Sequence, residues 1–425
     1  MKQLKILVFP CGSEVGLELY RSLRFVKEIE LFGGSSLPDH GRFVYERSIT
    51  DIPFVTDRAF TACINEVIAK YGINYILPAH DDVVLQLSES QQKGELLCPV
   101  ITSPVETCRI ARSKKRTMEL FRDIIRTPHV YDDISFITEF PVFLKPDEGQ
   151  GSKGTMIAMD KDEAQFHLSR DPDLLILEYL PGEEYTVDCY TNKDGTLLFH
   201  GARQRCRISN GISVNTKPVK YGEIEQIAFK INAHISLRGI WFFQLKRTKT
   251  GDFALMEIAP RMAGAMGMYR NLGVNLALIN IYEAEGYRVS ALPNIFDIEM
   301  DRALCSRFKL NISYKHVYID FDDCLLINNT INTCLISFLY QCVNEGVQIH
   351  LITRHAEEIR HSLTRFRIEA LFDSIIHLRN GEKKSPYIRH KDSIFIDDSF
   401  SERADVQSLC QIPVFAPDAV ESLIR

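Results

Sequence analysis

Short apolar strands alternate with amphipathic helices over the first hundred residues. A strand is predicted over Leu4–Phe9 and a helix from about Glu14, and a second helix over Phe60–Lys70 precedes another strand at Tyr75–Pro78. This alternation is typical of βαβ units, in which helices cover a parallel sheet. We therefore predict an N-terminal βαβ domain over residues 1–105.

After Ser103 the pattern changes to one of antiparallel strand pairs. A helix rich in Lys and Arg is predicted over Ser113–Arg122, and two strand pairs follow it. The expected pairs are Val142–Lys145 with Gly154–Met159, and Leu174–Leu177 with Tyr185–Thr191. These elements predict a central α+β domain over residues 106–312.

The pattern loosens over residues 294–314, and a second βα series then begins. Its first strand is predicted at Val317–Asp320 and its last at Ile394–Asp397. A chain of 425 residues is too long for one core, since cores stop growing near ~250–300 residues. We predict a third, Rossmann-like domain over residues 313–425, and an α/β multidomain protein as a whole.

Composition narrows the class of partner. Hydrophobic residues make up 45% and charged residues 25%, and the net charge of -6 provides no basic surface for nucleic acid or an anionic membrane. The apolar runs are far shorter than the ~20 residues that span a bilayer. Eleven cysteines without a CxxC pair favour neither a disulfide framework nor a thiolate zinc site. We expect a cytoplasmic protein that acts on small molecules.

The segment FLKPDEGQGSKGT carries the first candidate chemistry. Lys145 ends an apolar strand, and Gly149, Gly151 and Gly154 lie in the loop that follows. Glycines let backbone N–H groups approach phosphate oxygens closely, and a lysine supplies a positive charge for the same anion. The segment predicts a phosphate-binding loop, and an ordinary glycine-rich hairpin turn is the alternative.

Two further segments carry carboxylates near strands. In LLILEYLPGEEYTVD, Glu178 ends a strand whose edge suits an adenine, although a charged turn explains the segment equally well. In WFFQLKRTKTGDFALMEIAPR, Gln244 and Glu257 lie on strands predicted to be adjacent and antiparallel. Their oxygens suit Mg²⁺, because this hard cation prefers oxygen ligands. Arg261 is the alternative partner for Glu257, since a buried acid needs a cation or an arginine.

The order of these motifs over roughly residues 1–300 resembles the ATP-grasp superfamily, closest to one half of carbamoyl-phosphate synthetase and to amino-acid ligases. The resemblance implies an ATP site with Mg²⁺, or Mn²⁺ as the alternative cation. By position, it implies phosphate contacts from Lys114 (or Lys115), Lys145, Ser152, Lys153 and Gly154, an adenine frame of Glu178, Tyr179 and Leu180, a ribose contact at Glu184, and metal ligands Gln244 and Glu257. The family's usual Asn two residues after the metal-binding Glu is Ala259 here, which removes a ligand of the second Mg²⁺.

The resemblance implies that a substrate carboxylate attacks the γ-phosphate, and that an amine captures the acyl phosphate with release of ADP and phosphate. Arg261 and the basic run Arg203, Arg205 and Arg207 are candidates to bind the acyl phosphate or a substrate carboxylate, because guanidinium groups match these anions. A solvated basic strand face is the alternative for the run. The acids of His80–Asp82 suit a substrate amino group, or an N-cap for a helix from Val83.

The last domain carries acids and cations at predicted strand ends. Asp320 and Asp322 are two residues apart in YIDFDDCL, so both carboxylates leave the strand on one side and repel each other unless a cation binds. Later strand ends offer Thr353 in HLITR, Lys383 and Lys384 in GEKKS, and Asp397 and Asp398 in IFIDDS.

This order resembles the haloacid dehalogenase (HAD) superfamily, mostly phosphatases that form an aspartyl phosphate. The resemblance implies Asp320 as nucleophile, Asp322 as acid and base, Thr353 as phosphate binder, Lys384 (or Lys383) as charge partner, and Asp320, Asp322 and Asp397 (or Asp398) as Mg²⁺ ligands. Cys324 replaces the family's common Thr. Asp322 and Arg354 are too close in sequence for a large cap domain, so a bulky phosphorylated small molecule is the expected substrate. A degenerate regulatory domain is the alternative.

The leading hypothesis is a bifunctional enzyme that joins a carboxylate to an amine and dephosphorylates a second small molecule. A carbamoyl-phosphate-synthetase-like enzyme that forms carboxyphosphate from bicarbonate is one alternative. A non-catalytic nucleotide and phosphate sensor is the other, with Ala259 and Cys324 as signs of lost activity. A second copy of the chain is a further candidate partner, as a homodimer.

Overall fold

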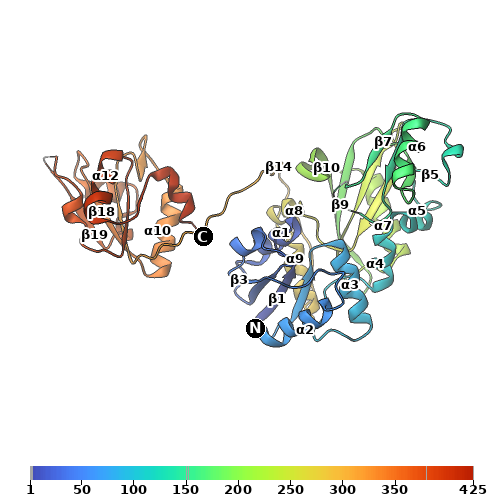
Figure 1. Cartoon of the computed structure of the whole chain (residues 1–425), viewed down its shortest axis with the longest axis horizontal. Coiled ribbons are helices and arrows are strands. Elements are labelled where there is room, and N and C mark those ends of the chain that lie inside the picture. Colours follow the sequence, from blue (N-terminus) through green and yellow to red (C-terminus); the bar gives the residue numbers. More distant parts are fainter. Residues whose placement is uncertain (1–2, 150, 152, 380, 425) are drawn as a thin grey trace. The chain divides into compact units, whose positions relative to one another are not determined.

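A computed structural model describes residues 3–149, 151, 153–379 and 381–424 of the chain (Figure 1). The chain divides into two compact units, Met1–Leu304 and Cys305–Arg425. The described segment 302–314 contains neither helix nor strand, and the predicted boundary after residue 312 lies within it. The further division of the first unit after residue 105 stays a prediction.

The first unit begins with a four-stranded parallel sheet. Its strands are β1 (Leu4–Phe9), β2 (Ile29–Gly34), β3 (Arg47–Ile49) and β4 (Tyr75–Pro78), in the order β3-β2-β1-β4. The helices between and after them are α1 (Glu14–Leu23), α2 (Phe60–Tyr71) and α3 (Asp81–Gln92). The predicted βαβ pattern is confirmed, because apolar side chains such as Ile6 and Ile76 are fully buried beneath these helices.

A smaller antiparallel sheet follows the helices α4 (Val105–Arg112) and α5 (Lys114–Phe121). It has the order β5-β8-β6-β7, with strands β5 (Val130–Tyr131), β6 (Val142–Lys145), β7 (Met156–Ala158) and β8 (Leu175–Glu178), and helix α6 (Lys161–Arg170) follows β7. The predicted pairing of β6 with β7 is confirmed. The predicted second pair is wrong: β8 pairs with β5 and β6, while the next strand belongs to another sheet. Pro181 and Gly182 separate the two strands, and a proline at this point interrupts a hairpin ladder.

The largest sheet of the first unit has six strands in the order β13-β12-β9-β10-β11-β14. They are β9 (Glu184–Thr191), β10 (Leu197–Ser209), β11 (Ile212–Pro218), β12 (Gly239–Arg247), β13 (Phe253–Ala259) and β14 (Met300–Asp301). Helices α7 (Gly222–His234), α8 (Gly267–Asn271) and α9 (Leu276–Ala284) connect and cover them. The sheet and α7 enclose a core around Trp241, the chain's single tryptophan.

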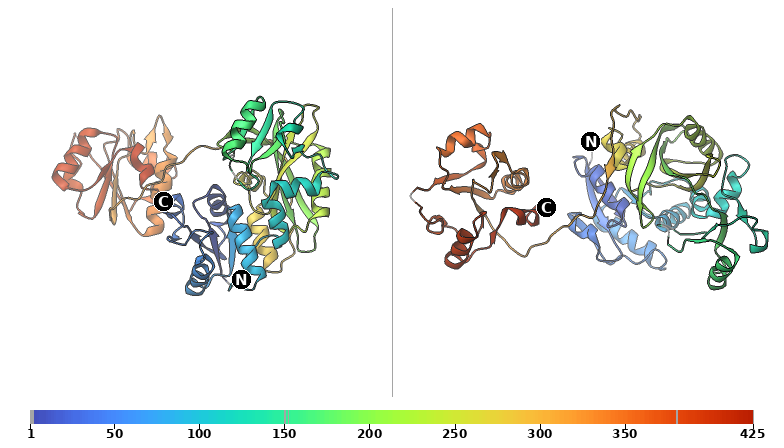
Figure 2. Two further views of the ribbon diagram at one scale, coloured as in Figure 1. Left: turned by 45° about the vertical axis from the view of Figure 1, so that its right-hand side comes forward. Right: turned by 90° about the horizontal axis from the view of Figure 1, so that it is seen from above.

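One hydrophobic core joins the N-terminal sheet to the six-stranded sheet. Val8 of β1, Tyr190 of β9 and Phe242 of β12 belong to the same buried cluster, together with residues of α8 and α9. Figure 2 shows the two sheets next to one another within this unit. The ends of β4, β12 and β13 therefore meet around a common space, which holds the candidate site.

The second unit has a five-stranded parallel sheet in the order β19-β18-β15-β20-β21. The strands are β15 (His316–Ile319), β18 (Gln348–Thr353), β19 (Ser374–His377), β20 (Ser393–Ile396) and β21 (Val414–Phe415). Helices α10 (Thr333–Glu345), α11 (Ile359–Arg365) and α12 (Phe400–Cys410) connect them, and a small hairpin, β16 (Leu326–Ile327) with β17 (Thr330–Ile331), precedes α10. The strands that follow β15 in sequence lie on both of its sides, β18 and β19 on one and β20 and β21 on the other. Ligands of open α/β sheets bind at the carboxyl ends of the strands where the strand order changes direction in this way.

Membrane-spanning helices and disulfide bonds were searched for in the described residues. No helix in the described part of the chain is both long and apolar enough to cross a membrane. Within the same ranges, no disulfide joins the eleven cysteines.

Candidate functional site

A cavity of about 970 Å³ lies within the first unit. Its lining comes from the starts of α1, α3 and α5, the end of α4, the loop after β6, the end of β8, and β9 to β13. The structure brings most of the predicted nucleotide-site residues to this one cavity: Lys114, Lys145, Lys153, Glu178, Tyr179, Leu180, Glu184, Arg205, Gln244, Glu257 and Arg261. Ser152 lies outside the described residues.

Lys145 is a buried cation in this cavity. It ends β6 with only 5% of its surface exposed, and burial lowers the pKa of Lys145 to about 8. The carboxylate of Glu257 acts in the opposite direction and favours the charged lysine. A charge held at such a cost is typical of a functional site, since only a bound anion would fully offset the desolvation.

Helix α5 brings a second lysine to the same place. Asp147, in the loop after β6, accepts hydrogen bonds from the Ser113 hydroxyl (2.7 Å) and the Lys115 backbone N–H (2.7 Å), which fixes the start of the helix. The Lys114 ammonium then donates to the backbone carbonyls of Asp147 (2.9 Å) and Gly149 (3.1 Å). Lys114 therefore faces the cavity, whereas Lys115 is exposed.

Gln244 and Glu257 are direct cross-strand partners of β12 and β13. The prediction that they lie on adjacent antiparallel strands is confirmed. Burial lowers the pKa of the Lys114 ammonium, while the nearby Glu257 carboxylate raises it, so this carboxylate faces both lysines. Two side-chain oxygens and two cations thus surround one part of the cavity.

A polar network continues from Gln244 toward β9. Arg205 donates to the Gln244 amide oxygen (3.0 Å) and forms an ion pair with Glu184 (2.7 Å), which also pairs with Lys246 (3.0 Å). Glu178 forms a separate pair with Arg126 (2.6 Å) and accepts from the backbone N–H of His129 (3.0 Å). The two carboxylates predicted to bind adenosine are therefore each held by a cation beside the cavity.

Arg203 and Asp188 form a fully buried ion pair that the sequence reasoning did not find. The guanidinium Nε lies 2.8 Å from Asp188, and neither side chain is more than 2% exposed. The alternative of a solvated basic strand face is therefore wrong for Arg203, although Arg207 does pair with Asp301 at the surface. Arg203 Nη1 is buried without a hydrogen-bond partner among the described residues, and Arg203 lines the cavity.

Arg261 pairs with Asp81 and not with Glu257, its alternative partner from the sequence. Its Nε and Nη2 donate to the two carboxylate oxygens of Asp81 at 2.6 and 2.7 Å, so it does not serve as the main partner of Glu257. Burial works to raise the pKa of Asp81, but the Arg261 guanidinium outweighs burial and the pKa is lowered. Helix α3 begins at Asp81 with His80 as its N-cap, so the expected acidic cap before Val83 is also wrong.

The glycine loop after β6 lies against a second turn. Gly211, between β10 and β11, has a φ of +75°, and a Cβ atom there would overlap the backbone of Gly151. The carbonyl of Gly211 also accepts a hydrogen bond from Arg205 Nη2 (2.6 Å). This close approach places the turn between β10 and β11 against the loop predicted to bind phosphate, and Gly154 (φ +70°) lies at the end of that loop before β7.

Ala259 is the residue that departs from the expected metal-ligand pattern. It is 6% exposed, belongs to the core shared with the N-terminal sheet, and pairs with Phe242 in the β12–β13 ladder. Ala259 also lines the cavity, and its methyl side chain offers no oxygen to a second cation there.

The second unit gathers its candidate residues at the carboxyl ends of its central strands. The Lys384 ammonium lies 2.9 Å from Asp320 and 2.6 Å from Asp397, and all three side chains are buried. Burial raises the pKa of Asp320 to about 6; Lys384 opposes this shift and Asp397 adds to it. The alternative Lys383 is exposed and lies 3.7 Å from Glu402.

A cluster of three carboxylates that suits a cation lies beside Lys384. One oxygen each of Asp320, Asp397 and Asp398 lies within 4.8 Å of the others, so both alternatives for the last ligand are present. Asp322, which was predicted to be a Mg²⁺ ligand, is not in this cluster. It is hydrogen-bonded to the imidazole of His355 (2.9 Å), whose other nitrogen is hydrogen-bonded to Ser362 (2.8 Å). The sequence reasoning missed His355, which follows the buried strand-end Thr353 by two residues.

Comparison with known proteins supports the fold of the first unit. The model of a family described as "ATP-grasp in the biosynthetic pathway with Ter operon" matches residues 170–301. A D-alanine–D-alanine ligase of Fusobacterium nucleatum is 29% identical over 167 residues, which is 36% of this chain and 55% of that protein. The chain thus spans only about half the length of that relative.

Solved structures are similar over about two thirds of the chain. The biotin carboxylase domain of a Hydrogenobacter thermophilus 2-oxoglutarate carboxylase, in complex with MgADP and bicarbonate, matches with a TM-score of 0.56 and 16% identity over 68% of this chain and 71% of that one. An L-amino acid ligase from Bacillus licheniformis matches with a TM-score of 0.52 and 13% identity over 67% and 74% of the two chains. The first unit has an ATP-grasp fold.

Proposed function

We propose that the first unit is an ADP-forming ligase that joins a carboxylate to an amine through an acyl phosphate. One observation carries the proposal: Lys114 and Lys145, from a helix and a strand, converge on a single cavity with the cross-strand pair Gln244 and Glu257. Phosphoryl transfer depends on positioning and charge neutralisation, and this arrangement supplies both cations and oxygen ligands around one space.

In this proposal the phosphates of ATP lie between the two lysines and Glu257. Binding a phosphate beside Lys145 would offset the cost of its buried charge, since an anion favours the protonated amine. The turns at Gly154 and Gly211 cover the phosphates, and Glu178 to Leu180 and Glu184 hold the nucleoside. Gln244 and Glu257 fit Mg²⁺ or Mn²⁺, because both offer oxygen atoms that face the same region. The bound cation would neutralise phosphate charge.

The substrate carboxylate attacks the γ-phosphorus, the bond to the ADP oxygen breaks, and an acyl phosphate forms. An amine then attacks the acyl carbon, and inorganic phosphate leaves. Arg203 is our candidate for the anionic oxygens, because its Nη1 is a buried donor without a partner in the described structure. Arg261 keeps its predicted role, with Asp81 fixing its orientation.

The similar proteins guide the choice of substrate. Two of them are named as amino-acid ligases, a D-alanine–D-alanine ligase and an L-amino acid ligase, whereas the biotin carboxylase structure contains bicarbonate. The similarity to the D-alanine–D-alanine ligase favours an organic acid and an amine over bicarbonate. We therefore propose amino acids or closely related compounds as the substrate class.

The test measures ADP release by the full chain over a panel of amino acids supplied alone and in pairs. The proposal requires ADP only when an acid and an amine are both present, with a product whose mass is their sum less one water. Glu257→Gln should abolish turnover, while the surface variant Lys220→Met serves as the matched control. Bicarbonate-dependent ADP release would favour the carboxyphosphate alternative. ATP binding without turnover on any substrate would favour the sensor.

A second activity is favoured by the group around Lys384. We propose a HAD-type phosphatase in which Asp320 attacks the phosphorus of a phosphate ester, Asp322 protonates the departing alcohol, and water then hydrolyses the aspartyl phosphate. Asp320 Oδ1 is buried without a hydrogen-bond partner among the described residues, and the three carboxylates fit Mg²⁺. Asp320→Asn should abolish hydrolysis of p-nitrophenyl phosphate and leave ligation unchanged. Retained hydrolysis would contradict this assignment.

A further inference from the structure

The second unit contains a separate group of three histidines. His316 is the first residue of β15, His350 is the third residue of β18, and His390 lies in the connection between the short helix η4 (Ser385–Tyr387) and β20. Asp320 follows the opposite end of β15. The group, called the histidine cluster below, therefore belongs to the other end of the strand from the proposed phosphatase residues.

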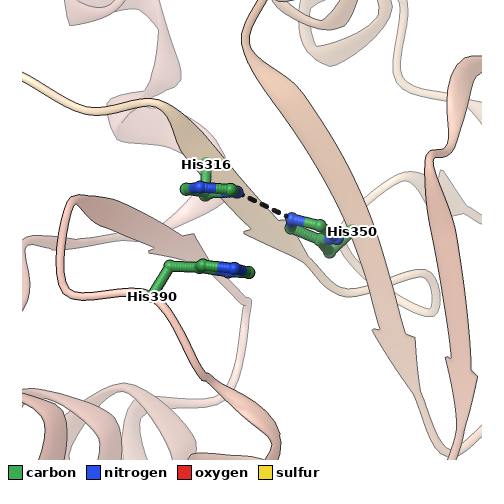
Figure 3. A group of neighbouring side chains, drawn as sticks. All are labelled: His316, His350 and His390. Atoms are coloured by element: carbon green, nitrogen blue, oxygen red, sulfur yellow. Dashed lines mark hydrogen bonds between the residues drawn. The ribbon is translucent and has the colours of Figure 1, made fainter.

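The three imidazoles of the histidine cluster lie close together (Figure 3). His316 Nδ1 is 3.1 Å from His350 Nε2, and the rings of His316 and His390 are stacked with centroids 3.6 Å apart. One ring nitrogen of each residue lies within 4.8 Å of the other two. Three imidazole nitrogens at this spacing form the ligand set that zinc and related transition metals prefer.

Two of the three rings are also held by a hydrogen bond through their other nitrogen. His350 Nδ1 lies 2.7 Å from the Ser374 hydroxyl, and His390 Nδ1 lies 2.8 Å from the Tyr318 hydroxyl. His316 Nε2 lies 3.9 Å from the Asp392 carboxylate. Metal-binding histidines almost always have such an outer partner, because it fixes the tautomer and aims the free nitrogen. His350 and His390 have such a partner, whereas His316 lies too far from Asp392 for a hydrogen bond. His316 Nδ1 and His350 Nε2 are hydrogen-bonded to each other, and bonds to a common metal ion would replace that contact.

The charges around the histidine cluster favour neutral rings. Burial lowers the pKa of His316 and His350, and the neighbouring imidazoles lower the pKa of both further. The charged groups that face them are the cation Lys315 and the carboxylates Asp373 and Asp392. A neutral imidazole keeps the lone pair that coordinates a metal, so metal binding at neutral pH would release few protons.

We propose that the histidine cluster binds a divalent transition metal of the zinc class, with the three imidazoles as ligands and a water or an external ligand in the fourth position. The rings of His316 and His390 lie in parallel planes, so their nitrogen lone pairs cannot point at one ion. One of these two rings therefore has to turn when the ion binds. His390 belongs to a connection rather than to a strand, and we assign the movement to it. The ion would tie this connection to β15 and β18.

This site differs in chemistry from the carboxylate group at the other end of β15. Imidazole nitrogens select zinc-class ions, while carboxylate oxygens suit Mg²⁺. The two sites can therefore be separated by saturating the full chain with Mg²⁺ and titrating Zn²⁺ in its presence by isothermal calorimetry. The proposal requires one tight Zn²⁺ ion per chain that excess Mg²⁺ does not displace, with an affinity that falls in acid because protons compete with the metal for the imidazole nitrogens.

Matched variants assign the ion to the histidine cluster. His390→Gln and His350→Gln should each remove the tight ion, while His361→Gln, an exposed histidine of α11, should leave it unchanged. Tyr318→Phe removes the outer partner of His390, together with the acceptor of the Arg389 backbone N–H, and should weaken Zn²⁺ binding roughly 10- to 100-fold. Circular dichroism checks the fold of each variant, and His390→Gln remains decisive if His350→Gln fails to fold. Absence of a tight ion in the parent chain, or its persistence in His390→Gln, would overturn the proposal.

Discussion

Replacement of Lys145 by Met should make the nucleotide-free first unit more stable. The folded pKa of about 8 lies below the ordinary value of 10.5, because burial penalises the charged amine. Below pH 8 the folded state therefore carries a buried charge at a cost of roughly 3 kcal/mol, since each tenfold loss of proton affinity corresponds to about 1.4 kcal/mol. The cost falls as the pH rises from about 8 to 10.5 and vanishes above that window.

Methionine removes this cost at neutral pH while keeping a chain of similar length. We expect Lys145→Met to raise the free energy of unfolding at pH 7 by up to roughly 3 kcal/mol, a net figure that already includes the attraction of Glu257, and to confer no gain above about pH 10.5. Trp241 is the chain's single tryptophan and is fully buried in the six-stranded sheet, so its fluorescence in a urea titration reports this unit alone.

The same substitution should weaken nucleotide binding. Losing one charge-assisted contact, worth about 1.5–3 kcal/mol, corresponds to roughly a 10- to 100-fold loss of affinity for MgATP. In the parent chain the affinity should fall by up to about tenfold per pH unit above pH 8, as Lys145 loses its proton, and Lys145→Met should flatten this profile. Lys220→Met, an exposed lysine, is the control. Unchanged stability and unchanged nucleotide affinity in Lys145→Met would refute the reasoning.

Three further substitutions probe the buried ion pair, the glycine contact and the second unit. Asp188→Asn leaves the Arg203 charge buried without its partner and should lower the tryptophan-detected unfolding free energy by about 3–5 kcal/mol, and a loss below about 1 kcal/mol would contradict the buried pair. Gly211→Ala places a Cβ against Gly151 and should raise the KM for ATP in the ligation assay, whereas parent-like kinetics would show that the contact is unimportant. Lys384→Met should abolish p-nitrophenyl phosphate hydrolysis with ligation intact, and hydrolysis at the parent rate would exclude a charge-partner role.

Local patterns in the sequence predicted the elements that carry the candidate site. The apolar segments and the TKTGD turn placed Gln244 and Glu257 on adjacent antiparallel strands, and in the structure the two residues are direct cross-strand partners. The strand-end position of Lys145 and the strand-end acids Asp320 and Asp397 followed from the same kind of pattern. These features depend on neighbours within a few residues, which periodicity encodes.

Such local patterns could not predict contacts between segments that are distant in the sequence. Arg261 pairs with Asp81, which is 180 residues away in sequence, and not with the nearby Glu257 that the sequence offered as an alternative partner. The predicted pairing of β8 with β9 is wrong for a similar reason, because a proline turn between two strands does not determine which sheet each strand joins. The partners of buried charges such as Arg203 depend on how sheets pack, and spacing along one strand carries no information about that.

The most direct test of the central claim is a crystal structure of the full chain with Mg²⁺ and a non-hydrolysable ATP analogue. We expect the triphosphate inside the cavity of the first unit, with its terminal phosphate contacting Lys145 and a cation on Glu257 and Gln244. A nucleotide bound elsewhere, with Lys145 and Glu257 not separated by phosphate, would contradict the ligase proposal.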